Sequence, residues 1–328
     1  MKSVFYLGVM VLIGWSVSAP QPANAKANPK YASIIMAADT GLILRQRNAD
    51  KPLHPASLTK VMTLLMVFEA LESRQIQVKD RVRISNHAAS MVPSKLGLKP
   101  GSSIRVQDAI YALVTKSAND VAVALGEHLA GSERNFATRM TAKARAIGMT
   151  RTTFKNASGL HDKRQITSAR DMAKMARYVI NVYPEYYRYF SRKNFTYAGS
   201  TYRNHNRLMD TYPGMDGMKT GYINASGFNL VASAKRNNRR IIGVVFVGRT
   251  SKSRNAHMEV LLDRGFSKLN EIRTAKADVP LPARKPAAIA AMASLGQGVT
   301  PRQLAAVSPA LGGLSGRVGE GDFDPVAS

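Results

Sequence analysis

The stretch FNLVASAKRNNRRIIGVVFV, residues 228–247, decides the fold of this chain. Two largely apolar runs flank the polar pair Asn237-Asn238, which is the pattern of a β-hairpin. The second run, residues 241–247, is apolar throughout, as expected for a central strand that is covered on both faces. This stretch therefore predicts the middle of a sheet with further structure packed against each side.

A second predicted hairpin lies near the other end of the chain. Residues 33–38 and 42–44 are apolar runs on either side of the turn Asp39-Thr40-Gly41. The sequence between the two hairpins has helical periodicity, with serines at capping positions. We predict a mixed α/β (α+β) fold, with one antiparallel sheet built from both chain ends, flanked by helices and holding an inserted helical block. The expected helices cover residues 61–71, 108–114, 120–129, 133–148, 168–184 and 258–272.

The two ends of the chain differ in composition from its middle. Lys2, an apolar run over residues 4–17 and a small-residue site ending at Ala25 predict a secretory signal over residues 1–25. The expected location is the periplasm or cell wall, whereas an uncleaved segment would hold the protein at the membrane. Residues 274–328, rich in alanine, proline and glycine, predict a flexible tail. The catalytic domain is therefore expected over residues 26–273.

Charge and composition bound the partners and cofactors. The formal net charge of +26 over 328 residues favours anionic partners, such as a membrane surface or a carboxylate-rich wall polymer. No nucleic-acid recognition motif is present, so we expect no nucleic-acid partner. The absence of cysteine excludes disulfides and thiolate catalysis. The six histidines are dispersed, so we expect no metal or other cofactor, and a plain loop residue is the simpler interpretation of His205.

Ser57 and Lys60 stand three residues apart at the start of an apolar helical stretch. Positions i and i+3 share a helix face, so the lysine amine can reach the serine hydroxyl. The hydroxyl becomes a nucleophile only when a base removes its proton, and lysine can do this only as the neutral amine. Burial and a second nearby cation would lower the pKa of Lys60 for this purpose. Taken alone, the pair better fits a capping serine followed by a surface lysine.

Two further strings supply complementary groups. Ser117 and Asn119 fall between two expected helices, where Ser117 can relay a proton and Asn119 can donate to a substrate carbonyl and to the lysine amine. Lys219-Thr220-Gly221 predicts a strand that presents a cation and a hydroxyl to an anionic group, while Gly221 lets a substrate backbone approach. Each string alone is also an ordinary capping pair or a turn glycine beside a surface lysine.

In this order the three strings resemble the motifs of penicillin-binding proteins and serine β-lactamases. Their contexts are similar to those of low-molecular-mass D-alanyl-D-alanine carboxypeptidases: HPASLTKVMT (54–63), KSAND (116–120), NASGL (156–160) and DGMKTGY (216–222). The resemblance implies a β-lactamase/transpeptidase-like fold and a serine-type hydrolase. Such an enzyme removes the terminal D-alanine from peptidoglycan stem peptides ending in D-Ala-D-Ala, and β-lactam antibiotics acylate the same serine.

The resemblance also implies a role for individual residues. Ser57 would carry the acyl group, Lys60 would accept its proton and Ser117 would assist proton transfer. The backbone N–H groups of Ser57 and Tyr222 would stabilise the oxyanion. The second Ser-x-Asn string, residues 253–255, is expected to be incidental. The implied substrate-binding residues are Asn119, Lys219, Thr220, Gly221, Tyr222 and Arg254.

Three other functions fit parts of the sequence. A DD-endopeptidase would cut peptidoglycan crosslinks with the same residues. A serine β-lactamase would use an additional glutamate to activate water, and only Glu127, Glu133 and Glu185 lie between the second and third strings. A non-catalytic wall-binding protein would use the basic surface alone. We expect the carboxypeptidase because every residue that its chemistry needs is present.

Overall fold

A computed structural model describes residues 31–277, with side-chain surroundings described as far as residue 272. The chain divides into two compact units, residues 1–272 and 273–328, and only residues 273–277 of the second unit are described. The predicted signal over residues 1–25 and residues 278–328 of the predicted tail lie outside the described residues. Within the described part, no helix combines the length and the apolar character that a membrane span needs.

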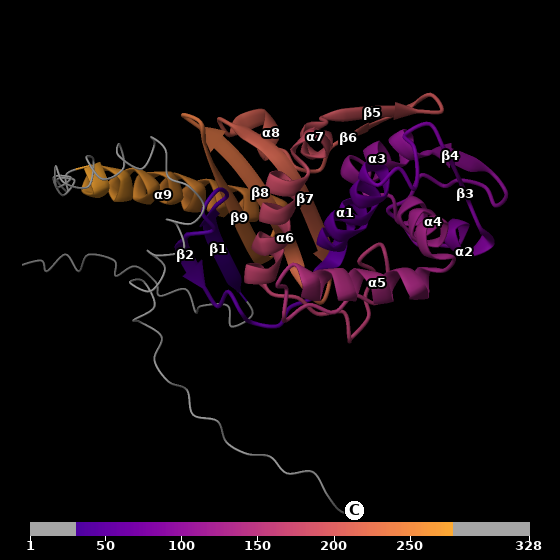
Figure 1. The fold of residues 1–328 in the computed structure, drawn as a ribbon, viewed down its shortest axis with the longest axis horizontal. Helices are drawn as coiled ribbons and strands as arrows, with labels where there is room; N and C mark the ends of the chain where they lie inside the picture. Colours follow the sequence, from indigo (N-terminus) through magenta and orange to yellow (C-terminus); the bar gives the residue numbers. More distant parts are fainter. Residues whose placement is uncertain (1–30, 278–328) are drawn as a thin grey trace, which may run out of the picture. The chain divides into compact units, whose positions relative to one another are not determined.

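Five antiparallel strands form the main sheet, in the order β2-β1-β9-β8-β7 (Figure 1). The strand with the continuous apolar run, β9, lies at the centre, between β1 from the early hairpin and β8 from the late one. Both predicted hairpins and the sheet built from the two chain ends are therefore confirmed. The strands are β1 (Ala32–Ala37), β2 (Ile43–Arg47), β7 (Met215–Ile223), β8 (Gly227–Arg236) and β9 (Arg239–Gly248).

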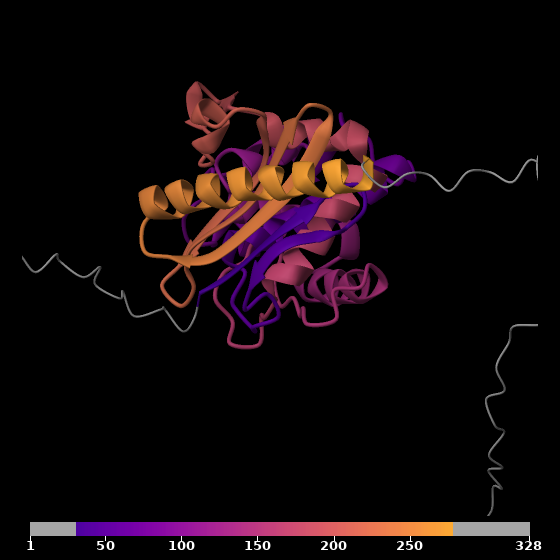
Figure 2. The same cartoon turned by 90° about the vertical axis from the view of Figure 1, so that its left-hand side faces the viewer.

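Helices cover both faces of this sheet because its central strand is apolar on both sides. Alternate residues of β9 enter different cores: Ile242 and Val244 lie in the core that α6 shares, and Ile241 and Val245 lie in the core that α9 shares. Figure 2 shows α9 lying across the strands. Each such buried side chain stabilises the fold by about 1.5–3 kcal/mol. Helix α6 spans Ala169–Val182 and α9 spans Ser251–Ala277.

Helix α9 begins at Ser251, well before the predicted start at Met258. Thr250 and Ser253 cap it reciprocally, since the Ser253 N–H donates to Thr250 Oγ1 (3.0 Å) and the Thr250 N–H donates to Ser253 Oγ (3.1 Å). The apolar periodicity starts only at Met258, so the pattern misses the polar first turns. At its other end the helix continues to Ala277, past the expected start of the tail at residue 274.

The inserted helical block is built around α1 (Thr59–Glu72), which is buried on nearly all sides, as predicted for a core helix. Two helices beside α1 approach each other closely at Gly126, where a Cβ atom would lie 2.8 Å from the ring of Phe136. The Ser132 and Ser168 hydroxyls cap α5 and α6, as predicted. The block also contains β3 (Arg81–Arg83), α2 (Asn86–Ala89), β4 (Ser103–Arg105), α3 (Val106–Val114), α4 (Asn119–Ala130) and α5 (Glu133–Ala146).

The segment between α6 and β7 holds elements that the sequence did not predict. Tyr187, in this segment, donates to Asp216 Oδ1 at 2.8 Å, and Arg240 of β9 donates to both carboxylate oxygens of Asp216 at 2.6 Å. Because Asp216 belongs to β7, this cluster fixes the start of the edge strand. The elements are α7 (Pro184–Tyr187), η2 (Arg188–Ser191), β5 (Asn194–Tyr197), β6 (Ser200–Arg203) and α8 (Leu208–Thr211).

Candidate active site

Ser57 lies in a 3-10 turn, η1 (Ala56–Leu58), that leads directly into α1, and Lys60 lies in the first turn of that helix. Lys60 Nζ is 3.2 Å from Ser57 Oγ, and the lysine is 0% exposed. The spacing of the pair therefore brings its two functional groups together. Burial, and then the charge of Lys219, hold the pKa of Lys60 well below its usual range, against the opposing charge of Asp120.

Two further oxygen atoms contact the amine of Lys60. Nζ donates to Asn119 Oδ1 at 2.7 Å and to the backbone carbonyl of Ser158 at 2.6 Å. A neutral amine has two N–H groups and one lone pair. When these two oxygens accept the N–H groups, the lone pair remains for the hydroxyl of Ser57. The surroundings therefore suit a lysine that acts as a base.

The hydrogen bond between Asn119 and Lys60 runs opposite to the expected direction. The sequence interpretation had Asn119 donating to Lys60, but its amide oxygen accepts from the lysine. The amide nitrogen donates instead to the backbone carbonyl of Val92, at 2.8 Å. With both ends of the amide engaged, Asn119 fixes the position of the lysine amine.

The Ser158 carbonyl belongs to a loop that the sequence analysis quoted without giving it a role. Glu133 Oε1 accepts the backbone N–H of Ala157 at 3.0 Å, which anchors this loop to α5. Gly159 has φ +89°, and a Cβ atom there would lie 1.9 Å from the backbone oxygen of Ala56. Only glycine therefore lets the loop lie against η1.

Ser117 lies in the loop between α3 and α4, with φ +60°. Ala56, the residue before Ser57, also has a positive φ, of +50°. A left-handed conformation costs a residue other than glycine about 1–2 kcal/mol, and such strain gathers at functional sites. Ser117 Oγ is buried and has no hydrogen-bond partner within residues 31–277. This hydroxyl is therefore available to a bound substrate.

The edge strand β7 runs alongside η1. A Cβ atom at Gly221 would lie 3.1 Å from the backbone nitrogen of Ser57, so the missing side chain permits this approach. Lys219 is 2% exposed, and burial and the charge of Arg254 lower its pKa to about 7. Its amine donates to the Thr220 carbonyl at 2.9 Å. Because β7 is an edge strand, its outer backbone groups can pair with an extended peptide.

Arg254, near the start of α9, is 3% exposed and held on two sides. Its guanidinium donates to Asn255 Oδ1 at 3.0 and 2.7 Å and to the Asn229 carbonyl at 3.0 Å. Burial lowers the pKa of Arg254 to about 10, so it remains a cation at neutral pH. Asn255 therefore orients the arginine, a contact that sequence reasoning missed, while Lys60 contacts Asn119 and not the second Ser-x-Asn string.

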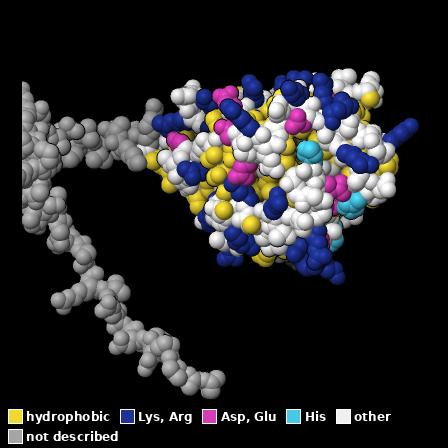
Figure 3. All heavy atoms as spheres, turned by 45° about the vertical axis from the view of Figure 1, so that its right-hand side comes forward, with side chains coloured by type: hydrophobic (Ala, Val, Ile, Leu, Met, Phe, Trp, Pro, Cys, Tyr) yellow, Lys and Arg dark blue, Asp and Glu magenta, His cyan; other side chains and the backbone are white. Residues whose placement is uncertain are grey.

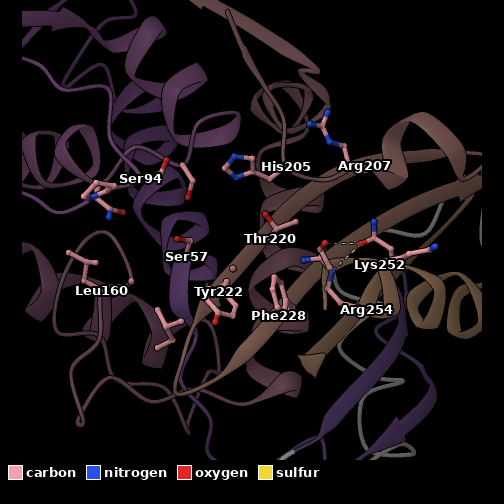
Figure 4. A pocket seen from close by; sticks show the side chains of 18 residues that line it. Ser57, Ser94, Leu160, His205, Arg207, Thr220, Tyr222, Phe228, Lys252 and Arg254 are labelled. Carbon is pink, nitrogen blue, oxygen red and sulfur yellow. Dashed lines mark hydrogen bonds between the residues drawn. The ribbon is translucent and has the colours of Figure 1, made fainter. Parts of the chain in front are cut away.

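A cavity of about 740 Å³ joins these groups, and Figure 4 shows the side chains around it. No aspartate or glutamate of the described chain lines it, so neither Glu127, Glu133 nor Glu185 stands where it could activate a water. Lys60 and Lys219 are buried behind its wall. The predicted site residues that line it are Ser57, Ser117, Asn119, Thr220, Gly221, Tyr222 and Arg254, and Ser94, His205, Arg207 and Lys252 join them.

The surroundings of the cavity suit an anionic substrate. Lys and Arg side chains are spread over the face seen in Figure 3 and cover more of it than Asp and Glu do. Ser57 and Arg254 both line the cavity, with Thr220, Tyr222 and Phe228 between them (Figure 4). No group of acidic, histidine or cysteine residues in the described part could hold a metal ion. The arrangement can attack a carbonyl carbon in a peptide whose terminal carboxylate is bound.

Known proteins share this architecture. A family model described as D-alanyl-D-alanine carboxypeptidase matches residues 17–250. The chain is 38% identical over 279 residues to the D-alanyl-D-alanine carboxypeptidase DacF of Bacillus subtilis (strain 168), over 81% of this chain and 70% of that protein. It is 36% identical over 268 residues to DacC, which has the same description, of Escherichia coli (strain K12), over 80% of this chain and 67% of that protein. Penicillin binding protein 5 from Haemophilus influenzae superposes with a TM-score of 0.70 at 37% identity, over 72% of this chain and 70% of that chain.

Proposed function

The chain belongs to the D-alanyl-D-alanine carboxypeptidase family, and we propose that Ser57 is the residue through which it removes the terminal D-alanine of peptidoglycan stem peptides. The observation that carries this assignment is the surroundings of Lys60. Its buried amine has two acceptors for its N–H groups and Ser57 Oγ at 3.2 Å for its lone pair. A solvent-exposed lysine would be protonated at neutral pH and could not accept a proton from the serine.

Acylation begins when Lys60 takes the proton of Ser57 and Oγ attacks the carbonyl carbon of the penultimate D-alanine. The oxyanion that forms is stabilised by the backbone N–H groups of Ser57 and Tyr222. The peptide bond then breaks, and the proton held by Lys60 passes through Ser117 Oγ to the amine of the leaving D-alanine. The unpartnered, buried hydroxyl of Ser117 supports this relay.

Deacylation uses the same base. Lys60, again neutral, accepts a proton from a water molecule, and the resulting hydroxide attacks the acyl carbon. The bond between Oγ and carbon breaks, and the proton returns from Lys60 to Ser57. One base thus serves both half-reactions, so no additional glutamate is needed.

Recognition of the substrate rests on its terminal carboxylate and its backbone. Arg254, Lys219 and Thr220 would bind the carboxylate, and Asn119 would contact the peptide amide. The stem peptide would pair with the outer edge of β7, beside Gly221. A β-lactam presents a carboxylate and a strained amide in the same relation, so it would acylate Ser57 as the substrate does.

Penicillin labelling tests the assignment directly. We expect labelled penicillin to form one adduct on the peptide that contains Ser57, and Ser57→Ala to abolish it. Wild-type protein should also release D-alanine from a stem pentapeptide, with no activity in the variant. Equal labelling of both proteins, or an adduct on another residue, would refute the role of Ser57. A crosslinked dimer as a second substrate would detect endopeptidase activity.

The place of action is a further part of the proposal. We expect the enzyme to act outside the cytoplasm, after cleavage of residues 1–25, with residues 26–273 as the catalytic domain and residues 274–328 as a tail. The charge of +26 supports association with an anionic wall or membrane surface. N-terminal sequencing of the protein from the periplasmic or cell-surface fraction tests this. An intact N-terminus in a cytoplasmic fraction would contradict it.

A further inference from the structure

A second cavity, of about 600 Å³, lies next to the active site and is separate from it. Arg254 is the one residue of the described chain that lines both cavities. The second cavity is enclosed by β2, the end of β9 and the first half of α9, which Figure 2 shows above the early hairpin. None of the roles assigned to the active-site residues uses this space.

Arginine supplies the charge of this cavity. Arg45 and Arg47 come from β2, Arg249 from the loop after β9 and Arg264 from α9, and all four are exposed. Together with Arg254 they line a space in which the described chain places no lysine, aspartate or glutamate. Arg45, Arg249 and Arg264 form no ion pair with any residue between 31 and 272.

Nearby carboxylates are engaged elsewhere. Asp263, the neighbour of Arg264 on α9, pairs with Arg236 at 3.1 Å and accepts the hydroxyl of Tyr212 at 2.9 Å. Asp50, which follows β2, accepts Arg170 at 2.8 Å. Neither carboxylate lines the cavity, so the charge of its arginines is not neutralised within the described chain.

Three of the arginines lie near one imidazole, that of His257. The hydroxyl of Tyr31 lies 2.6 Å from His257 Nε2, and the guanidinium of Arg47 lies 5.6 Å from the centre of the Tyr31 ring. Burial lowers the pKa of His257, and the charges of Arg264, Arg45 and Arg47 lower it further. Cations from two separate elements therefore act on a single imidazole. Like charges that line one cavity without a neutralising carboxylate repel one another, and a bound anion would relieve this repulsion.

We propose that this cavity binds a phosphate group, as a second ligand site beyond the carboxypeptidase site. A guanidinium offers planar, paired donors that match the oxygens of phosphate, and arginine is the residue that recognises such groups by geometry. A carboxylate has two oxygens and accepts one such pair of donors, whereas a phosphate can accept paired donors from several directions. Here the guanidiniums come from β2, from the loop after β9 and from α9. The phosphate belongs either to a lipid headgroup or to a soluble phosphate compound.

Arg254 separates this ligand from the catalytic groups. Its guanidinium is fixed by Asn255 and by the Asn229 carbonyl, so it forms a wall between the two cavities. Changing the exposed arginines of the second cavity should therefore leave acylation of Ser57 intact. Acylation by penicillin then serves as a check that each variant is folded and has an intact active site.

Two charge-matched double variants test the proposal. R45E/R264E removes two arginines of the cavity, and R83E/R134E replaces two exposed arginines that line neither cavity and form no ion pair with a described residue. Both lower the net charge equally, so they differ only in where the charge lies. Should the two glutamates prevent folding, R45Q/R264Q replaces the first variant and R83Q/R134Q replaces its control, so that the charges stay matched.

Binding is measured with two probes at roughly 0.15 M salt, where diffuse surface attraction is screened. Calorimetric titration with inorganic tripolyphosphate detects a soluble phosphate. Co-sedimentation with vesicles containing phosphatidylglycerol, against pure phosphatidylcholine vesicles, detects a lipid headgroup. We expect wild type and R83E/R134E to bind at least one probe with dissociation constants within about twofold of each other, and R45E/R264E to bind it at least about tenfold more weakly.

Each outcome decides the proposal. If R45E/R264E loses tripolyphosphate binding and R83E/R134E keeps it, the ligand is a soluble phosphate. If R45E/R264E loses vesicle binding and R83E/R134E keeps it, the ligand is a lipid headgroup. Equal weakening in both double variants would show diffuse attraction by net charge and would overturn the proposal. Absence of binding of either probe to the wild-type protein would also overturn it.

Discussion

Replacing Asn119 with aspartate tests whether Lys60 works as a neutral base. The oxygen that accepts from the lysine lies 2.7 Å from Nζ, so Asn119→Asp places a negative charge at that distance. Two unit charges so placed attract by about 6 kcal/mol at an effective dielectric constant of ~20. Burying the new carboxylate costs several kcal/mol of this, which leaves about 2–3 kcal/mol in favour of the protonated lysine. That preference raises the pKa of Lys60 by about two pH units.

The measurement is the pH dependence of acylation by penicillin. A base must be neutral, so a higher pKa of Lys60 moves the acidic limb of the profile to higher pH. We expect a shift of about two pH units for Asn119→Asp, and about 100-fold slower acylation where the acidic limbs of both proteins can be compared. Asn119→Ala is the control, because it removes the acceptor without adding charge and should slow acylation without this upward shift. An unchanged acidic limb in Asn119→Asp would refute the assignment of Lys60 as the base.

Three other predictions follow from the same structure. Gly159→Ala places a Cβ atom 1.9 Å from the Ala56 oxygen, at a φ of +89°. We expect this variant to lose at least about 2 kcal/mol of stability in thermal unfolding and to be acylated more slowly by penicillin. Wild-type values for both quantities would contradict the proposed contact. Ser168→Ala removes the hydroxyl that caps α6 by accepting the Asp171 N–H at 3.1 Å. We expect the free energy of unfolding in denaturant to fall by about 1 kcal/mol, while acylation by penicillin stays unchanged. Ser168→Thr, which keeps a capping hydroxyl, is the control. The pKa of Lys219 is lowered to about 7, so its positive charge is lost as the pH rises through 7. We expect the KM for a stem pentapeptide to rise there, while kcat changes little. A KM that stays flat between pH 6 and pH 8 would show that the charge of Lys219 does not help to bind the substrate carboxylate.

The fold was largely predictable where the sequence carries a long, regular pattern. The apolar run at residues 241–247 predicted the central strand, and the capping serines placed the starts of α5 and α6. Short elements such as β3, β5 and β6 escaped because three or four residues cannot establish a period, and tertiary contacts stabilise them. The start of α9 escaped for another reason, since its first turns are polar and rest on side-chain caps.

The site was predictable only in its parts. The three-residue spacing from Ser57 to Lys60 predicts their contact, because a helical turn dictates it. No spacing within the sequence predicts that Lys219 comes close enough to Lys60 to lower its pKa, because the two residues lie on different elements far apart in the chain. The acceptor from Ser158 is a backbone carbonyl, which any residue provides, so no side-chain motif could show it. The bond from Arg254 to Asn255 depends on rotamers that the sequence does not encode locally.

The burial of two lysines explains how this site can contain a neutral amine that accepts a proton. Neither Lys60 nor Lys219 forms a hydrogen bond or ion pair with a carboxylate within the described chain, although both are almost fully buried. Such a partner would stabilise the ammonium form and restore a high pKa. Asp120, whose charge acts on Lys60, instead accepts backbone N–H groups of the loop between α2 and β4, including that of Gly97 at 2.8 Å. Those groups hold the Asp120 charge away from hydrogen-bond contact with the amine, so burial lowers the pKa of Lys60 without a paired carboxylate to oppose it. The burial that costs stability is therefore what would let Lys60 serve as the proposed base.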